Sequence, residues 1–464
     1  MINKDLLYQK APNWLQTLLL NTHAFNLHRR RYNKTFWKLM DEFKKNERLT
    51  KQEIEEYQNG KLRSLIKHAY ENVPFYKERM ENIKLLPTDI KDQKDLYKLP
   101  ILSREDVRSN FKKLQATDHS RNKLILGHTS GTTGSPLEFF WDNKVEIIHH
   151  IADWRQKIWA GLEFSDRYAS LQGRVIVPIE RRRPPFWKTN YINNQLFLSS
   201  FHLQKKNIPY YIDKLISYKT NAIEGYPSTL YILAKHLLSN NTVLPLKAAL
   251  TSAETLFPAQ RRTIEAAFQC KVFDFYGMAE RVVYASECDR HEGHHLNLDY
   301  GITEILDANN EHVPPEKVGR IVATGLWNYG MPLIRYMTSD TTALSSKKCS
   351  CGRVFPLMED VTTKDEDIVT TTDGRLISSS VLTHPFKPMH NIEESQIIQE
   401  DLSNITVKIV KKKTYSDEDS LQLKMALKER LGDDVNINLE FVEFIPRTKN
   451  GKFRWVISKV PLEF

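Results

Sequence analysis

The sequence lacks any apolar run of the length needed to span a bilayer, which is about 18–20 residues. Its longest apolar stretch near the N-terminus, residues 14–20, is short and is interrupted by Gln16. No small-residue cleavage site follows this stretch, so a secretory signal is not expected. We therefore expect a cytoplasmic protein, with peripheral attachment to the inner face of the membrane as the alternative.

Cysteine is scarce as well, with four among 464 residues. Disulfides are not expected in a cytoplasmic protein, so cysteines that stand close together suggest a metal site instead. The sequence has no recognisable helix-turn-helix, finger or RNA-binding motif, and nucleic acid is not an expected partner. It also has no internal repeat of fixed period, which argues against a solenoid.

Positive charge exceeds negative charge, since 67 basic and 57 acidic residues give a net charge of +10. Such an excess favours anionic partners: nucleotides, an acidic sugar chain, coenzyme A or a membrane surface. The basic clusters at residues 29–31, 181–183 and 411–413 are explained first as solvated faces. Residues 14–31 could form a basic amphipathic helix on a membrane, but we favour an ordinary helix packed on the protein.

The pattern of apolar residues changes twice along the chain. Residues 1–120 have helical spacing of apolar side chains, with a helix that stops at Asn72-Val73-Pro74. From residue 121, β-branched runs at 174–178 and 271–275 alternate with helical stretches at 209–216 and 259–268, which is typical of an α/β core. From residue 365, expected strands at 394–399, 404–410 and 435–444 and a helix at 416–431 form a small α+β unit.

We therefore predict an α/β protein with two domains. The large N-terminal domain has a helical part (residues 1–120) and an α/β core (residues 121–364). A small, mobile α+β domain follows (residues 365–464). The boundary falls near residues 361–367, which are polar and charged as linkers tend to be.

Residues 128–137 combine glycines with an unusual number of hydroxyl side chains. Glycine lets the backbone approach a ligand closely, and successive backbone N–H groups can cradle phosphate oxygens. The Gly-Lys-Ser/Thr ending of a Walker A loop is missing, and a polar surface turn is the alternative. The candidate phosphate-binding residues are Ser130, Gly131, Thr132, Thr133 and Gly134.

Further motifs follow this loop in a fixed order. They are Thr-Ser-Ala-Glu-Thr at 251–255, Tyr-Gly-Met-Ala-Glu at 276–280, Arg-Tyr-Met-Thr-Ser-Asp at 335–340 and Asn-Gly-Lys at 450–452. Together with the loop they resemble the adenylate-forming (acyl-AMP) enzyme superfamily. Within it, the chain is similar to the branch of phenylacetate–CoA ligase, coenzyme F390 synthetase and CapK-like capsule-biosynthesis proteins. The resemblance covers nearly the whole chain.

This resemblance implies that ATP activates a carboxylic acid as an acyl-adenylate with release of pyrophosphate. Glu280 would help to bind Mg²⁺, and Lys452 would bridge the attacking carboxylate and the α-phosphate. The implied ATP/AMP-binding positions besides the loop are Glu254, Tyr276, Gly277 and Asp340, with Tyr276 stacked on adenine and Asp340 on the ribose hydroxyls. The acyl group would then pass to coenzyme A or to an amine or carrier acceptor.

Some positions depart from the family pattern. Ala279 replaces a hydroxyl residue that contacts phosphate, and Ser339 replaces a glycine before the ribose aspartate. At the expected hinge near Asp365, Thr363 stands where the family favours arginine, and Lys364 could partly compensate. Because the loop and the lysine are retained, we favour an active enzyme over a degenerate one.

Three cysteines and one histidine have spacing suited to a closed tetrahedral zinc site. The candidate ligands are Cys288, His295, Cys349 and Cys351, a pattern that members of the resembled branch often carry. His291 and His294 are alternative nitrogen ligands, and buried apolar cysteines are the alternative to a metal. Cys270 is assigned to the core.

The substrate and its acceptor are the least defined predictions. We expect the acid-binding region between residues 168 and 226, where Arg174, Arg181 and His202 offer contacts suited to an acidic sugar or a hydroxylated acid. Each of the three is equally well explained as a surface residue or as a polar residue of the core with its hydrogen bonds satisfied. Alternatives to a CoA ligase are an amide-forming or acyl-transferring ligase for surface polysaccharide and a non-catalytic nucleotide-binding scaffold. A glycan carboxylate as substrate and a homodimer are further possibilities that the sequence leaves open.

Overall fold

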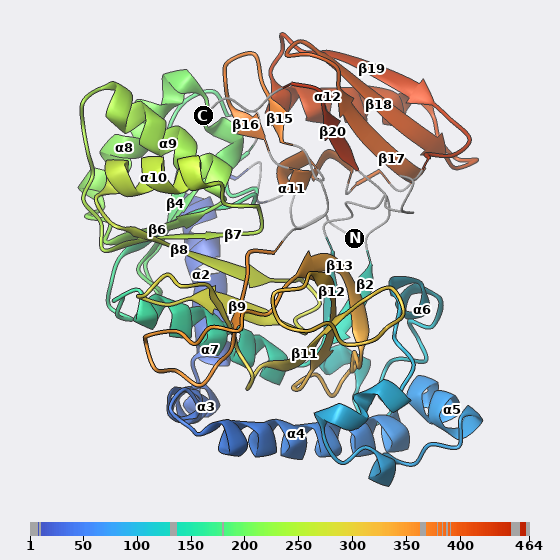
Figure 1. Cartoon of the computed structure of the whole chain (residues 1–464). Coiled ribbons are helices and arrows are strands. Elements are labelled where there is room, and N and C mark those ends of the chain that lie inside the picture. Colours follow the sequence, from blue (N-terminus) through green and yellow to red (C-terminus); the bar gives the residue numbers. More distant parts are fainter. Residues whose placement is uncertain are drawn as a thin grey trace.

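A nine-stranded sheet forms the centre of the protein (Figure 1). The structure is a computed structural model that describes residues 8, 11–129, 137–178, 181–361, 368–377, 379–382, 384–386, 388–389, 391–446 and 455–460. Across the sheet the strand order is β14-β10-β9-β8-β7-β6-β3-β5-β4, and β5, β3, β6, β7 and β8 are parallel. The strands are β3 (Tyr168–Leu171), β4 (Trp187–Asn190), β5 (Gln195–Leu198), β6 (Ala222–Gly225), β7 (Ala248–Ser252), β8 (Lys271–Gly277), β9 (Tyr284–Glu287), β10 (His294–Leu296) and β14 (Leu357–Met358).

Helices cover this sheet and confirm the predicted α/β core. The helices that connect the parallel strands are α8 (Ile208–Ser217), α9 (Pro227–Ser239) and α10 (Pro258–Phe268), with the short turns η4 (Ser200–His202) and η5 (Lys205–Asn207) before α8. Helix α7 (Asn143–Trp159) lies on the other side in Figure 1. Apolar residues of β3, β6 and β7 pack with those of α8 to α10 in one buried cluster. Parallel strands need such crossover helices, which is why the alternation of strands and helices along the chain predicted the fold class.

The expected strand at residues 174–178 is wrong. Ile176 and Val177 are buried, but the segment forms no ladder. Strand β3, which precedes it, already pairs with β6 on one side and β5 on the other. No free edge beside β3 is therefore left for this β-branched run, which follows an irregular path.

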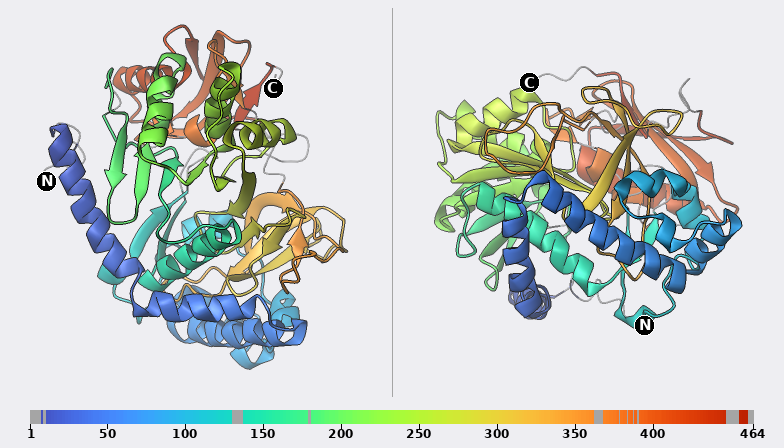
Figure 2. Two further views of the ribbon diagram at one scale, coloured as in Figure 1. Left: turned by 90° about the vertical axis from the view of Figure 1, so that its left-hand side faces the viewer. Right: turned by 60° about the horizontal axis from the view of Figure 1, so that its bottom comes forward.

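The N-terminal helices form a layer below the sheet and along one side of it (Figures 1 and 2). They are α2 (Asn13–Arg31), α3 (Lys34–Asn46), α4 (Lys51–Asn72), α5 (Pro74–Asn82) and α6 (Arg104–Ser109), with the turns η1 (Pro87–Asp89), η2 (Gln93–Lys98) and η3 (Arg121–Lys123). A capping box of Thr50 and Glu53 starts α4, and Pro74 ends it as predicted.

Helix α2 packs on the protein, as we favoured. Asn21 Nδ2 donates to the Thr189 carbonyl oxygen at 2.9 Å, and Arg31 lies 2.7 Å from Glu146 of α7. In the part of the chain that the structure describes, no helix is long and apolar enough to cross a membrane.

Two smaller sheets flank the central one. One is the hairpin of β1 (Ile125–His128) and β2 (Glu138–Trp141), and the other contains β11 (Gly301–Leu306), β12 (Gly319–Gly325) and β13 (Tyr336–Thr342). The hairpin joins both ends of the candidate phosphate loop, because Thr129 N donates to the Leu137 carbonyl oxygen at 3.0 Å.

The C-terminal segment has its own sheet and core. Its elements are β15 (Val369–Thr370), β16 (Leu376–Ile377), α11 (Ser379–Leu382), η6 (His384–Phe386), β17 (Ile392–Gln399), β18 (Asn404–Lys411), α12 (Asp417–Leu431), β19 (Asn436–Phe441) and β20 (Val456–Ser458). Alternate residues Ile405, Val407 and Ile409 of β18 are buried, as period-two patterning requires. The predicted strand–strand–helix–strand order is confirmed. The domain boundary stays a prediction, because residues 362–367 lie outside the described ones.

Candidate functional site

Tyr276 and Asp340, which are 64 residues apart in the sequence, meet in the structure. Tyr276 lies near the end of β8 and Asp340 lies in β13, and the Tyr276 hydroxyl donates to Asp340 Oδ2 at 2.7 Å. Burial, with Asp340 beside it, raises the pKa of Tyr276 well above its usual value, so the phenol stays protonated as a donor. The contact holds one oxygen of the carboxylate in a defined direction.

Glu280 lies in the turn after β8 and is 6% exposed. Its Oε1 accepts a hydrogen bond of 2.9 Å from the Tyr336 hydroxyl. Burial raises the pKa of Glu280, while the Tyr336 hydrogen bond and the charge of Arg104 oppose this rise. A buried carboxylate with few partners is suited to a hard cation, which would supply the missing positive charge.

Arg104 connects this carboxylate region to the base of the candidate phosphate loop. Its Nη2 donates to Thr129 Oγ1 at 2.9 Å, and the same oxygen accepts from Leu137 N at 3.0 Å. Neither Arg104 nor Tyr336 was predicted from the sequence as a site residue. Tyr336 could have been found, because it stands inside the motif at 335–340, whereas nothing marked Arg104.

The loop residues Ser130, Gly131, Thr132, Thr133 and Gly134 and the lysine Lys452 lie outside the described residues. So do the hinge positions Thr363, Lys364 and Asp365. Their predicted roles therefore stay predictions.

The other motif residues have structural partners. Glu254 accepts hydrogen bonds of 3.1 Å from Ser228 N and Ser228 Oγ, at the start of α9. Gly277 ends β8 opposite Tyr284 of β9. Arg335 is buried and forms an ion pair with Glu304, with Arg335 Nη2 at 2.9 Å from Glu304 Oε1. This pair holds the start of β13 against β11.

The candidate zinc ligands converge, and their four ligand atoms lie within 4.8 Å of one another. Cys288 Sγ is 3.6 Å from Cys349 Sγ, and Cys351 Sγ is 3.5 Å from His295 Nε2. His295 Nδ1 bonds the Phe355 carbonyl oxygen at 3.0 Å, so Nδ1 carries the proton and Nε2 presents its lone pair to the cysteines. Burial lowers the pKa of His295 to about 4, which keeps it neutral as a ligand must be.

The two alternative histidines point elsewhere. His294 bonds Asp274 at 3.1 Å, and His291 faces Glu287 at 3.4 Å. Backbone N–H groups of Arg290 and Arg353 approach Cys288 Sγ and Cys351 Sγ at 3.4 and 3.5 Å. The donor set consists of three sulfurs and one imidazole, and backbone groups hydrogen-bond to the imidazole and to two of the sulfurs. Such a set fits zinc.

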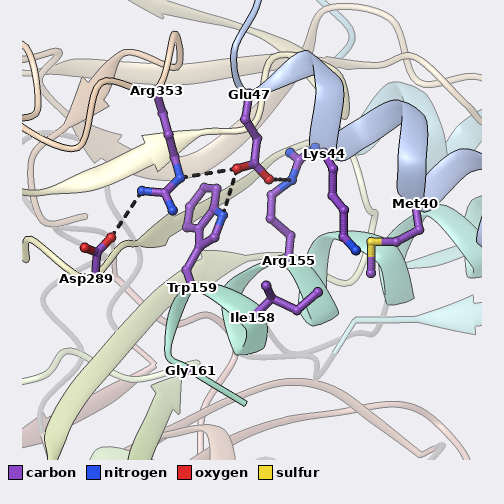
Figure 3. A pocket seen from close by; sticks show the side chains of 9 residues that line it. All are labelled: Met40, Lys44, Glu47, Arg155, Ile158, Trp159, Gly161, Asp289 and Arg353. Atoms are coloured by element: carbon purple, nitrogen blue, oxygen red, sulfur yellow. Dashed lines mark hydrogen bonds and ion pairs between the residues drawn. The ribbon is translucent and has the colours of Figure 1, made fainter. Parts of the chain in front are cut away.

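A buried charge network fastens the cysteine loop to the N-terminal helices (Figure 3). Glu47 lies 3.3 Å from both Arg155 Nε and Arg353 Nε, and it accepts from Trp159 Nε1 at 3.1 Å. Arg353 also lies 3.2 Å from Asp289, which follows Cys288 in the chain. The network therefore fixes both chain segments that carry cysteines.

A cavity of about 430 Å³ opens at the carboxyl ends of β3, β6, β7 and β8, and its lining includes Phe275 and Arg281, the chain neighbours of Tyr276 and Glu280. Ligands of parallel α/β sheets bind at this end of the strands. Arg174 lines it as expected, whereas His202 is held in the core by Ser199 Oγ at 2.8 Å and stacks on Phe186. Arg181 does not line the cavity among the residues the structure describes.

Comparison with known proteins places these features in context. Residues 369–459 match the sequence family described as the CapK C-terminal domain. Protein CapK of Staphylococcus aureus is 26% identical over 467 residues, which cover 98% of this chain and 99% of CapK. A phenylacetate-coenzyme A ligase of Thermus thermophilus is 23% identical over 462 residues, which cover 89% of this chain and 98% of that ligase.

The fold is also found in solved structures. The 2-hydroxyisobutyryl-CoA ligase in complex with 2-HIB-AMP and CoA matches with a TM-score of 0.59 and 20% identity. The match covers 89% of this chain and 91% of that one. It confirms the predicted fold class, a large α/β part followed by a smaller C-terminal part.

Proposed function

We propose that the chain is an adenylate-forming enzyme of the CapK-like branch, which it resembles in sequence and fold, and that it activates a carboxylic acid with ATP. The products of the first step are an acyl-adenylate and pyrophosphate. The acyl group then passes to a thiol such as coenzyme A, or to an amine or carrier acceptor. Surface polysaccharide synthesis is the proposed setting, which the similarity to CapK supports.

The observation that carries this proposal is the hydrogen bond between Tyr276 and Asp340 beside the buried Glu280. An aromatic ring and an oriented carboxylate suit the base and ribose of a nucleotide. Glu280 lies four residues along the chain from Tyr276, where it can hold the Mg²⁺ of the nucleotide. The cavity at the strand ends is lined by Phe275 and Arg281, the chain neighbours of Tyr276 and Glu280, and offers room for the acid.

The chemistry requires little covalent participation from the protein. A carboxylate oxygen attacks the α-phosphorus as the bond to the pyrophosphate oxygen breaks, so positioning and charge stabilisation supply the rate. Bound Mg²⁺ would supply positive charge to the phosphates. We assign the loop from Ser130 to Gly134 to the β- and γ-phosphates, Lys452 to the carboxylate and α-phosphate, and Glu254 and Gly277 to the adenine side.

We also propose that Cys288, His295, Cys349 and Cys351 bind a structural zinc ion. Four protein ligands leave no open position for substrate, so the zinc would fix the loop and take no part in the reaction. Its attachment to the Glu47 network explains how it would stabilise the large domain.

Pyrophosphate exchange and hydroxamate trapping with a panel of carboxylic acids test the function. We expect exchange that depends on an acid and disappears in Lys452→Ala, with Lys428→Ala, an exposed lysine on α12, as the control. Exchange without consumption of CoA would favour the amide ligase. ATP binding with no exchange for any acid would leave a nucleotide-binding scaffold, and near-normal exchange in Lys452→Ala would refute the lysine assignment.

A further inference from the structure

The cavity at the strand ends is lined by charged side chains of both signs, among them Asp153, Glu224 and Arg281. Its acidic side chains have partners, because Lys157 Nζ lies 2.8 Å from Asp153 Oδ2 and 2.9 Å from Glu224 Oε2. The charge of Arg174 also acts on Glu224. Both carboxylates are therefore already balanced by cations of the protein.

Two histidines add no charge to this lining. Burial lowers the pKa of His149 and of His150 well below the usual value, and the charges of Arg281 and Arg31 lower them further. Arg31 is itself paired with Glu146 at 2.7 Å. Arg281 makes no ion pair in the described part of the chain, although the charge of Glu146 acts on it from a longer distance.

The guanidinium of Arg281 is held in place, but its hydrogen-bonding capacity is not fully used. It stacks 4.0 Å above the Trp141 ring, and its Nη1 is buried with no hydrogen-bond partner among the described residues. Burial lowers the pKa of Arg281; the charge of Glu146 opposes this shift and that of Arg31 adds to it. A buried guanidinium with an unused donor is costly unless a ligand completes it.

The backbone at Arg281 supports a ligand-directed role. Its φ is +57°, in the left-handed region that side chains other than glycine seldom adopt. Such strain persists at positions where a side chain must be aimed. Here it lets successive residues serve two sites, since Glu280 bonds Tyr336 on the nucleotide side and Arg281 lines the cavity.

We propose that Arg281 binds a second anionic group of the acid substrate, so that the cavity selects acids that carry a further carboxylate, sulfate or phosphate. The guanidinium fork matches such oxygens in two parallel hydrogen bonds. This inference rests on the proposed function, since it names the class of acid that the same site activates. The contacts predicted from the sequence for the acid were Arg174, Arg181 and His202, and Arg281 was not among them.

Acid-dependent pyrophosphate exchange with matched acids tests the inference. The pairs are glutarate against valerate and 2-carboxyphenylacetate against phenylacetate. Gluconate, a monocarboxylate whose remaining polar groups are uncharged hydroxyls, serves as a further comparison. We expect kcat/KM to be at least about tenfold higher for the member with the second carboxylate. Arg281→Met, which keeps the stem over Trp141, should remove this preference, and Arg281→Lys should keep part of it. Arg262→Met, an exposed arginine on α10, should leave it unchanged.

Equal use of both members of each pair by the wild-type protein would overturn the inference. A preference for the dicarboxylates that survives in Arg281→Met would also overturn it. So would a preference for gluconate that the wild type and Arg281→Met share. Failure of every acid in exchange would instead contradict the proposed function. In that case a thermal shift with glutarate alone still decides the role of Arg281: a shift present in the wild type and lost in Arg281→Met supports it, and no difference refutes it.

Discussion

Removal of the Tyr276 hydroxyl isolates the contact on which the proposed nucleotide site depends. Tyr276→Phe keeps the ring that is proposed to stack on adenine but deletes the 2.7 Å hydrogen bond to Asp340. Hydrogen bonds to a charged group contribute about 1.5–3 kcal/mol. If this energy orients Asp340 for the ribose, its loss raises the KM for ATP by about 10- to 150-fold, since each 1.4 kcal/mol is a factor of ten.

The assay is pyrophosphate exchange at varied ATP and saturating acid, with thermal unfolding measured on the same samples. We expect a raised KM for ATP and a kcat within about threefold of wild type, because the hydroxyl contributes to binding and not to bond formation. Tyr210→Phe, which alters a half-exposed tyrosine of α8, serves as the control. An unchanged KM for ATP in Tyr276→Phe, or a loss confined to kcat, would refute this reasoning.

Other perturbations lead to separate expectations. Because burial raises the pKa of Glu280, its ionised form destabilises the fold above the ordinary value of 4.5, so Glu280→Gln should abolish exchange yet raise the Tm at pH 7 by about 2–4 °C. This gain should vanish at pH 4, where the wild-type carboxyl is protonated, and no gain at pH 7 would contradict it. Cys349→Ser should release bound zinc, measured by metal analysis, and lower the Tm by at least about 5 °C; a metal-free protein of full stability would refute the site. Arg155→Met leaves the buried Asp299, 2.6 Å from Arg155 Nη2, without its partner and should cost about 3–5 kcal/mol in urea unfolding. The added change Asp299→Asn should recover part of that loss, and an additive further loss would contradict the pairing.

The fold class followed from local patterns because those patterns and the tertiary structure agree. Apolar spacing predicted α10 and α12 closely, and period-two runs predicted β17 and β18. The run at 174–178 failed, because strand formation requires a free neighbour and β3 has none. No local propensity carries that information.

The candidate site was predictable where a motif concentrates its residues. Tyr276, Glu280 and Asp340 were found in this way, and the structure brings them to one end of the sheet. Arg104 and Arg281 were not predicted, because a single arginine belongs to no motif with a defined spacing. Their contacts are with residues far away in the sequence. For His202 the sequence left a substrate contact and a core position open, because a polar side chain in sequence gives no sign of its burial; the structure shows the core position.

The fate of a carboxylate oxygen tests the central claim most directly. An acid that supports exchange, labelled with ¹⁸O in its carboxylate, is incubated with ATP and an acceptor, and the phosphate products are analysed by mass spectrometry. Because the carboxylate oxygen attacks the α-phosphorus, we predict one ¹⁸O in AMP and none in pyrophosphate. Label in inorganic phosphate together with ADP, or no label in AMP, would contradict acyl-adenylate formation.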